Sequence, residues 1–345
     1  MENTISRSQI KNIGKRLRIS NLGTPLDSKD LEILNKWRSY HESSLKYYAK
    51  KLKEEASNLN LNSNDYTVTQ RIKRVHSIIL KLKRFPLMQL SMMDDIAGAR
   101  IVLPNNLQVS QLVETFKNKK NKHELIKLKN YISHPKEDGY RSIHAVYKIN
   151  KQPTIHIEIQ FRSLLQHCWA TGVEVFGTLE KTSFKTGEGT EEWKHFFRLL
   201  SSRFAIKENT PLLAEHEIYS AKQIEQQLIA TIRKLNIIEQ LNTYTSLYSS
   251  DWRSMRAKGR SGKYALITLD TIRNNTDVKF FAESKFQEAL NQYAAIEKVH
   301  HSSNDINVVL VNLDNINNLE RAYPNYFMNT KLLVNLLSCI VLGEF

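Results

Sequence analysis

Two acidic side chains stand near predicted strands in a stretch of the sequence that is rich in Arg and Lys. Asp95 occurs in the segment DDIAGAR, and Glu158 occurs in the segment IEIQ. Carboxylate oxygens are the hard ligands that Mg²⁺ prefers, and neighbouring cations can neutralise a triphosphate. The two acids therefore predict a site for a nucleoside triphosphate and its metal ion. The ordinary alternative is that each acid only supports the local fold, and that Gly98 only permits close packing of the backbone.

A second group of chemically capable side chains lies in residues 134–144, HPKEDGYRSIH. This segment combines a Pro, a Gly and two acids with Lys136, Arg141, two histidines and a tyrosine, and an apolar strand follows it directly. So many hydrogen-bond donors directly before a strand raise the question of what this loop is for.

Alternation places Glu158 on a polar surface. In the segment TIHIEIQF, residues 154–161, every second residue is apolar. The opposite face carries His156, Glu158, Gln160 and then Arg162. The segment SIHAVYKI adds a similar face with Ser142, His144 and Lys148. An ordinary solvated strand has this pattern too, but two such strands side by side predict a polar sheet face with a carboxylate, an amide, histidines and cations.

Apolar residues at helical spacing predict the elements that position these strands. Residues 28–57 read as an amphipathic helix that begins with Ser28, and residues 68–85 read as a second helix. The exposed side of the second helix is expected to carry most of a polar set, namely Arg71, Lys73, Ser77, Lys81 and Arg84. A Lys-rich, helix-like stretch follows around residues 107–128. A basic helix face is usually only solvated.

Helices dominate the segment after the central strands. Residues 163–207 look helical and well packed, and a long helical pattern runs from Pro211 to about residue 249. Short strands and helices then indicate a small α/β unit. We therefore expect an α/β (α+β) fold with a mixed sheet flanked by helices. The predicted divisions are an N-terminal helical region at 1–58, a core at 59–207, a connecting helix at 208–250 and a smaller C-terminal α/β unit at 251–345.

Charge is the unusual feature of the composition. The 345 residues include 50 Lys and Arg against 35 Asp and Glu, and the net charge of +15 favours a polyanionic ligand. A basic surface kept for solubility explains it equally well. The two cysteines, Cys168 and Cys339, exclude a disulfide framework and a cysteine zinc site. The sequence shows no signal peptide and no stretch that could span a bilayer, so we expect a cytoplasmic protein without a membrane partner.

Four segments resemble, in order and spacing, the synthetase domain of the RelA/SpoT-type alarmone synthetases: RIKRVHSIILKLKR, DDIAGARIV, YISHPKEDGYRSIHAVY and IEIQFRSLLQHCWA. The resemblance covers roughly residues 60 to 180. It implies a nucleotidyltransferase-like mixed sheet flanked by helices. It also implies Mg²⁺-assisted transfer of the β,γ-pyrophosphate of ATP to the ribose 3′-hydroxyl of GDP or GTP, with AMP as the second product.

Position by position, the resemblance implies a division of labour. The ATP side would be lined by Arg71, Lys73, Ser77, Lys81 and Arg84, with Arg100 helping to hold the adenine. Asp95 would be the principal Mg²⁺ ligand, and Glu158 would bind the same ion or take the proton of the attacking hydroxyl. The acceptor side would be formed by Lys136, Tyr140, Arg141, His144 and Gln160. Lys136 and Arg141 would meet phosphates, and Gln160 would contact the acceptor ribose.

The loop has a specific expectation within this resemblance. His144 would assist at the pyrophosphate, and Tyr140 would stack on the acceptor base. Gly139 would turn the chain so that Tyr140 stands out of the sheet as an exposed platform. An Arg that only bridges a carboxylate, or a Tyr that only plugs the edge of the core, would give the same sequence.

The chain departs from the commoner members of that family. Where many have a WAxxEH-type motif, this chain has WATGVEVF, so Glu174 is only an approximate counterpart and no histidine follows it. No His-Asp dipeptide occurs, and few residues precede the synthetase motifs. We therefore expect a small stand-alone synthetase without the family's metal-dependent hydrolase domain.

Two other functions stay open. The same chemistry could act on the 3′-terminal adenosine of tRNA, as in some toxic small relatives, because the chain has many lysines that could follow a phosphate backbone. These are Lys50, Lys51, Lys53, Lys117, Lys119, Lys120, Lys122, Lys127 and Lys129. An inactive nucleotide sensor or nucleic-acid-binding module ranks last, because both acids are present. The sequence leaves open whether the C-terminal unit recognises an antitoxin or another regulatory partner.

Overall fold

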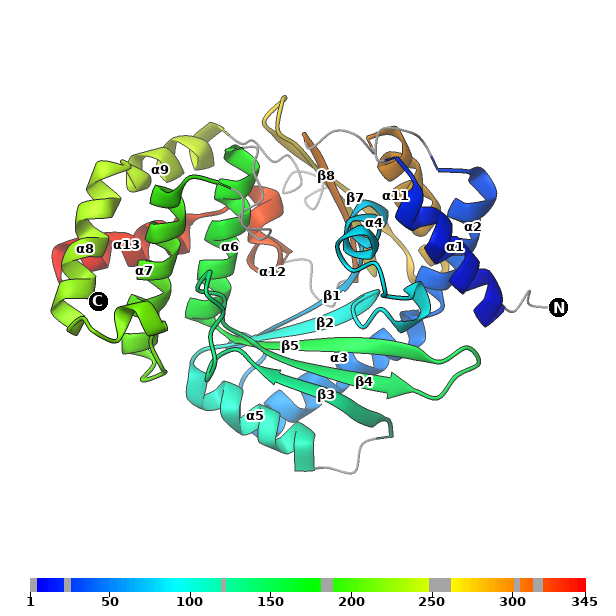
Figure 1. The fold of residues 1–345 in the computed structure, drawn as a ribbon, viewed down its shortest axis with the longest axis horizontal. Helices are drawn as coiled ribbons and strands as arrows, with labels where there is room; N and C mark the ends of the chain where they lie inside the picture. The colour runs from blue at the N-terminus through cyan, green and yellow to red at the C-terminus, as the bar shows by residue number, and fades with distance from the viewer. Residues whose placement is uncertain are drawn as a thin grey trace.

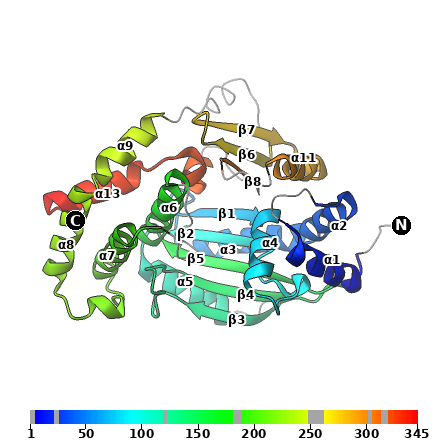
Figure 2. The same cartoon turned by 45° about the horizontal axis from the view of Figure 1, so that its top comes forward.

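The computed structural model of the protein describes residues 5–21, 26–118, 122–180, 189–247, 262–300, 305–312 and 319–345. Within this part of the chain, eight strands form one sheet in the order β3-β4-β5-β2-β1-β8-β6-β7 (Figures 1 and 2). The strands are β1 (Thr67–Ile72), β2 (Ala97–Leu103), β3 (Glu124–Asn130), β4 (Ile143–Ile149), β5 (Ile155–Ser163), β6 (Tyr264–Asp270), β7 (Asn275–Phe281) and β8 (Ile306–Asn312).

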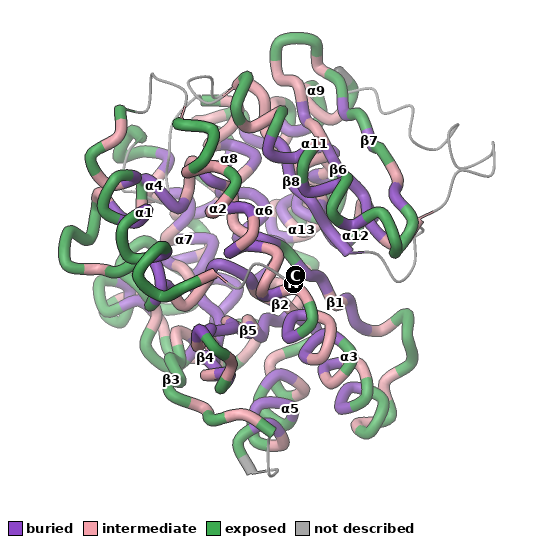
Figure 3. The backbone as a smooth tube through the Cα atoms, turned by 90° about the vertical axis from the view of Figure 1, so that its right-hand side faces the viewer, coloured by how far each residue is buried: buried purple, intermediate pink, exposed green. Residues whose placement is uncertain are grey.

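The sheet is mixed, as the sequence predicts. Strands β2 and β5 are parallel, and the other neighbouring strands are antiparallel. The strict alternation in β5 is confirmed, because the side chains of Ile155, Ile157, Ile159 and Phe161 are fully buried. The burial colours of Figure 3 show the central strands as the core of the molecule.

Helices cover both faces of the central strands. Helices α3 (Glu42–Asn58) and α5 (Asn106–Asn118) lie on one face, while α4 (Val75–Arg84) and α6 (Leu164–Leu179) lie on the other (Figure 1). Beside α4 lie α1 (Arg7–Ile19), α2 (Ser28–Ser39) and α11 (Phe286–Val299). Beside α6 lies a group of helices formed by α7 (Glu191–Lys207), α8 (Ala221–Lys234), α9 (Ile237–Leu247) and α13 (Lys331–Leu342). No helix of the described segments combines the length and apolar content that a membrane crossing requires.

Two predicted helices are shorter than expected. The helix predicted for residues 28–57 is two helices, because the chain turns at Tyr40 and His41, where the fully buried His41 ring bonds to the carbonyl oxygen of Trp37 at 2.8 Å. Its N-cap is Asp27 and not Ser28. The helix predicted for residues 68–85 is wrong in its first half, which forms β1. The β-branched residues of TVTQRI favour a strand, and pairing with β2 outweighs the helical spacing of the following segment.

Two other stretches also change conformation partway. The Lys-rich stretch around 107–128 is helical only up to Asn118, and its end belongs to β3. The long helix predicted after Pro211 is divided into α8 and α9, because Asn236 adopts a left-handed conformation with φ of 51°. Asn tolerates this region better than other residues with a side chain, and a helix cannot continue through it.

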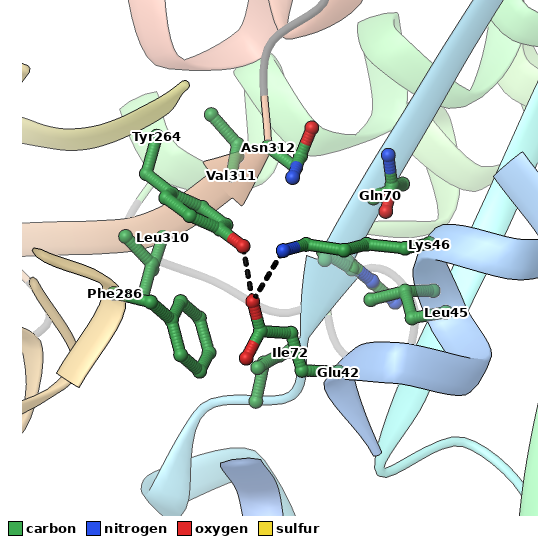
Figure 4. A pocket seen from close by; sticks show the side chains of 11 residues that line it. Glu42, Leu45, Lys46, Gln70, Ile72, Tyr264, Phe286, Leu310, Val311 and Asn312 are labelled. Atoms are coloured by element: carbon green, nitrogen blue, oxygen red, sulfur yellow. Dashed lines mark hydrogen bonds and ion pairs between the residues drawn. The ribbon is translucent and has the colours of Figure 1, made fainter. Parts of the chain in front are cut away.

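The predicted C-terminal strands are present, and they continue the central sheet. Strand β8 pairs with β1 at Val311 and Arg71. Strand β6 is fastened to α3, because the Tyr264 hydroxyl donates a hydrogen bond to Glu42, which also pairs with Lys46 at 2.9 Å (Figure 4). The predicted domain boundaries stay predictions, and residues 248–261 lie outside the described residues.

Candidate active site

The polar face of the sheet consists of two rows of side chains that run across the strands. In the first row, Glu158 on β5 pairs with Gly98 on β2, which pairs with Arg71 on β1. Because Gly98 has no side chain, β2 leaves the surface open between the acid and the arginine. A Cβ atom on Gly98 would lie 3.2 Å from the backbone oxygen of Glu158. The second row contains His144, Gln160 and Arg100, aligned on β4, β5 and β2.

Asp95 lies in the turn before β2 and holds two lysines. Its carboxylate oxygens accept hydrogen bonds from Lys73 Nζ and Lys81 Nζ, each at 2.8 Å. Burial works to raise the pKa of Asp95, but the charges of Lys73 and Lys81 outweigh it and hold the pKa well below its usual range. Lys73 follows β1 and Lys81 belongs to α4, so the acid ties the start of β2 to both elements.

Glu158 is held from both sides by the second row. One carboxylate oxygen lies 3.1 Å from Nδ1 of His144, and the other accepts a hydrogen bond from Nε2 of Gln160 at 2.8 Å. Burial favours the neutral acid, but the bond and charge of His144 outweigh it and lower the pKa of Glu158 to about 2. The charge of Asp95 opposes this lowering, so the two acids lie within electrostatic reach of each other.

The remaining predicted ATP-side residues surround this pair unevenly. Arg100 donates a hydrogen bond to Gln160 at 3.2 Å, and burial together with the charges of Arg162 and Arg71 lowers the pKa of Arg100 to about 9. Ser77 and Arg84 lie on the same helix as Lys81. The guanidinium of Arg84 stands 5.6 Å from the centre of the Phe85 ring. The structure thus gathers Asp95, Lys73 and Lys81 in one cluster, and Glu158, His144, Gln160 and Arg100 in a second.

The predicted turn at Gly139 is confirmed. Its φ is +94°, a conformation that residues with side chains rarely adopt. An added Cβ atom would lie 2.9 Å from Cβ of Ser201 and 3.1 Å from Trp169. Ser201 on α7 also donates a hydrogen bond to the carbonyl oxygen of Gly139 at 2.7 Å. The loop therefore packs directly against α6 and α7.

Arg141 points away from the polar face. Arg141 is 4% exposed, and its guanidinium donates hydrogen bonds to Ser201 Oγ at 2.9 Å and to the carbonyl oxygen of Ile132 at 3.4 Å. Burial lowers the pKa of Arg141 to about 10. The structure places it as an anchor between the loop and α7, and it does not bring it together with the acids.

Tyr140 is half-buried, whereas the sequence suggested an exposed platform. Its hydroxyl lies 2.7 Å from Nε2 of His144 and accepts a hydrogen bond from Arg162 at 2.8 Å. Cations lie over its ring, with Lys136 Nζ at 5.0 Å and the Arg162 guanidinium carbon at 5.2 Å from the ring centre. Burial would raise the pKa of the hydroxyl, but Arg162 and His144 outweigh it and lower it to about 7. Stacking of a base on this ring stays a prediction.

Three residues that received no role from the sequence also reach this region. Arg162, which alternation had placed on the polar face, bonds to Tyr140. Burial works to lower the pKa of the Arg71 guanidinium, but the attractions of Glu174 on α6, Tyr326, Asp95 and Glu158 together outweigh it and raise this pKa. Tyr323, at the end of α12 (Leu319–Ala322), exchanges hydrogen bonds of 3.1 and 2.8 Å with the backbone of Gln70 on β1. No local pattern could have predicted this last contact, because 253 residues separate the two partners.

The two acids fit a divalent cation of the hard type. Mg²⁺ is commonly held by one or two carboxylates and completes its shell with water and phosphate oxygens. Asp95 and Glu158 supply such carboxylates within electrostatic reach of each other, and both stay ionised because their pKa values are lowered. In this structure the ammonium groups of Lys73 and Lys81 bond to the Asp95 oxygens and balance the charge of the carboxylate, a role that a metal ion would also serve.

Comparison with known proteins points to one family. Residues 70–178 match the model described as the region found in RelA/SpoT proteins. The chain is 34% identical over 111 residues to the GTP pyrophosphokinase YjbM of Bacillus subtilis, which covers 30% of the chain and 52% of that relative. It is 32% identical over 114 residues to the GTP pyrophosphokinase YwaC of the same organism, with 29% and 52% covered. The match therefore spans about half the length of these curated relatives.

One solved structure also aligns with part of the chain. The small alarmone synthetase 1 of Bacillus subtilis, bound to its product pppGpp, aligns with 50% of the chain and 93% of its own. The sequence identity is 24% and the TM-score is 0.44.

Proposed function

We propose that this chain, whose residues 70–178 are a RelA/SpoT-type synthetase region, is an ATP-dependent pyrophosphotransferase that acts on the ribose 3′-hydroxyl of GDP or GTP. The observation that supports the proposal is that Asp95 and Glu158 lie within electrostatic reach of each other, with Lys73 and Lys81 bonded to Asp95 and with Arg100 bonded to Gln160 beside Glu158. The names of the matched relatives support the same activity.

The chemistry assigns one role to each part of the site. The 3′-oxygen of the acceptor attacks the β-phosphorus of ATP, the bond from that phosphorus to the oxygen bridging the α-phosphate breaks, and AMP leaves. Glu158 takes the proton of the attacking hydroxyl, because it is ionised and His144 and Gln160 fix its orientation. Lys73, Lys81 and Arg100 neutralise the triphosphate and the charge that develops on AMP. Mg²⁺ held by Asp95 and Glu158 would polarise the phosphate oxygens.

A labelled-phosphate transfer assay tests this function. Purified protein receives ATP labelled on the γ-phosphate, and GDP, GTP, ADP, ATP and bulk tRNA are offered separately. We expect the label on GDP or GTP, and we expect Glu158→Gln to lower kcat by about 10²- to 10⁴-fold, the usual contribution of general acid–base catalysis. Glu288→Gln, an exposed acid on α11, is the control. Unchanged transfer by Glu158→Gln contradicts the mechanism, and no label on any acceptor leaves only a binding function.

A second acceptor, the 3′ end of tRNA, is favoured by the position of two lysines. Lys127 and Lys129 lie on β3, where Lys129 aligns with His144 and Lys127 aligns with Val146, the neighbour of Glu158. Each of the two rows of the site is therefore extended by one lysine on β3, the exposed outer strand. By contrast, Lys50 and Lys53 lie on α3 and Lys117 on α5, both on the opposite face of the sheet. Lys119 and Lys120 lie outside the described residues.

Charge reversal separates the two acceptors. If tRNA enters across β3, Lys129→Glu should weaken label transfer to tRNA and reduce the slope of log activity against log salt by about one, because one phosphate contact is lost. Transfer to GDP should change little. Lys50→Glu makes the same charge change on the opposite face and serves as the matched control. Equal effects of the two variants on tRNA would contradict entry across β3.

A further inference from the structure

A continuous chain of hydrogen bonds links the carboxylate of Glu158 to the loop of residues 134–144. Arg162 donates to the Tyr140 hydroxyl at 2.8 Å, this hydroxyl lies 2.7 Å from Nε2 of His144, and Nδ1 of His144 lies 3.1 Å from Glu158. The members come from β5, the loop and β4, so the chain crosses three separate segments. Arg162 also lies 3.4 Å from Gln160, which holds the second oxygen of Glu158.

The Glu158 carboxylate at the end of this chain determines which way its hydrogen bonds point. An ionised carboxylate accepts hydrogen bonds and cannot donate, so Nδ1 of His144 carries the hydrogen in the bond to Glu158. Its Nε2 then remains for the Tyr140 hydroxyl. The imidazole is therefore held at both nitrogens, and its orientation depends on the tyrosine as well as on the acid.

The far end of the chain is fixed by packing. The rings of Tyr140 and Trp169 pack at an angle of 65° with 6.3 Å between their centres, and the preceding Gly139 is bonded to Ser201. The indole nitrogen of Trp169 in turn donates to the carbonyl oxygen of Phe197 at 2.8 Å. The Tyr140 ring thus packs against α6 and the residue before it is bonded to α7, so the hydroxyl can serve as a reference point for His144.

We infer that the Tyr140 hydroxyl is a positioning group, which orients His144 and through it the carboxylate of Glu158 toward the attacking 3′-hydroxyl. This inference rests on the proposed function. This role differs from stacking on the nucleobase of the acceptor. The ring would contribute to binding of the acceptor, whereas the hydroxyl contributes to kcat.

Tyr140→Phe tests the inference, because it removes the hydroxyl and keeps the ring. Misplacement of a reacting group by about 1 Å can cost about 10²-fold, so we expect kcat to fall 10- to 100-fold while KM for GDP changes less than twofold. Loss of one hydrogen bond leaves the protein folded, which a thermal melt checks. An unchanged kcat, or a higher KM with an intact kcat, would overturn the inference and leave Tyr140 as a binding residue only.

A matched pair of variants at His144 provides the second measurement. The amide nitrogen of an Asn can take the position of Nδ1, whereas that of a Gln reaches the position of Nε2. We therefore expect His144→Asn to retain more kcat than His144→Gln. In the Tyr140→Phe background, His144→Asn should cost little more, because the two residues act in one chain. Additive losses would overturn the inference. An inactive wild type overturns the proposed function and the inference together, whereas an active wild type with an active Tyr140→Phe overturns the inference alone.

Discussion

Gly139→Ala should destabilise the acceptor loop by two separate effects. The first is conformational, because φ is +94° and a residue with a Cβ atom loses about 1 to 2 kcal/mol in the left-handed region. The second is steric, because the new Cβ atom would lie 2.9 Å from Cβ of Ser201 and 3.3 Å from the carbonyl oxygen of Phe197. Both belong to α7, whose backbone cannot shift cheaply. Overpacking of this kind costs about 1 to 3 kcal/mol.

Gly343 provides the matched control. It also has a positive φ, +74°, but a Cβ atom built there meets nothing within 4 Å. Gly343→Ala therefore carries the conformational cost alone, about 1 to 2 kcal/mol. The sum for Gly139→Ala is about 2 to 5 kcal/mol, so its melting temperature should fall about twice as far or more.

Thermal unfolding and steady-state kinetics together measure the outcome. We expect Gly139→Ala to lower both the melting temperature and kcat/KM for the acceptor, since the loop carries Tyr140. Gly343→Ala should change only the melting temperature. Equal shifts in melting temperature for the two variants would refute the contact with α7 as the source of the additional cost.

Three further predictions concern contacts away from the acids. Glu297→Ala should cost about 3 to 5 kcal/mol of unfolding free energy in a urea titration, because it leaves the fully buried Arg38 without its acidic partner at 3.0 Å. Adding Arg38→Met should recover most of the loss. Burial lowers the pKa of His41 to about 3, so as the pH falls the imidazole is protonated in the unfolded chain before it is protonated in the folded protein. The stability of the fold therefore falls as the pH drops below about 6.5. Urea titrations give the free energy of unfolding at pH 6.5 and at pH 5. The decrease between these two pH values should be about 2 kcal/mol smaller in His41→Gln than in the wild type. Arg141→Lys and Ser201→Ala should lower kcat for the acceptor to a similar extent, because both remove the hydrogen bond between Arg141 and Ser201. A loss with Arg141→Lys alone would instead support the predicted contact of Arg141 with a phosphate.

Alternation of apolar and polar residues made β2, β4 and β5 predictable, whereas β1 and β3 carry no comparable signal in the sequence. Strands β2, β4 and β5 have one apolar face each, and this pattern is local. Strand β1 runs into α4 with no Gly or Pro between them, so residues 68–85 looked like one helix. Strand β3 has no buried face, with six of its seven residues exposed, and so it carries no apolar period.

The acids were easier to predict than the loop for a physical reason. The strands that carry Glu158 and Gly98 determine which side chains share a face, and register follows from alternation. Arg141 and Tyr140 depend on Ser201 and Trp169, which are distant in sequence and belong to helices. A local pattern shows that Arg141 is a cation, but not that its guanidinium is buried.

The shared sheet makes β1 an interior strand, and this has a consequence for deletion experiments. A chain shortened to end before β6 would lose β8 and would leave the outer edge of β1 without its partner. Unpaired strand edges recruit other chains and promote aggregation. The same cut would remove Glu297, which accepts a hydrogen bond from the first residue of α4 at 2.8 Å. Point substitutions on the surface of β6 and β7 are therefore a better test than truncation of what the last strands contribute. A truncated protein would lose activity because its sheet does not fold, whatever the role of these strands.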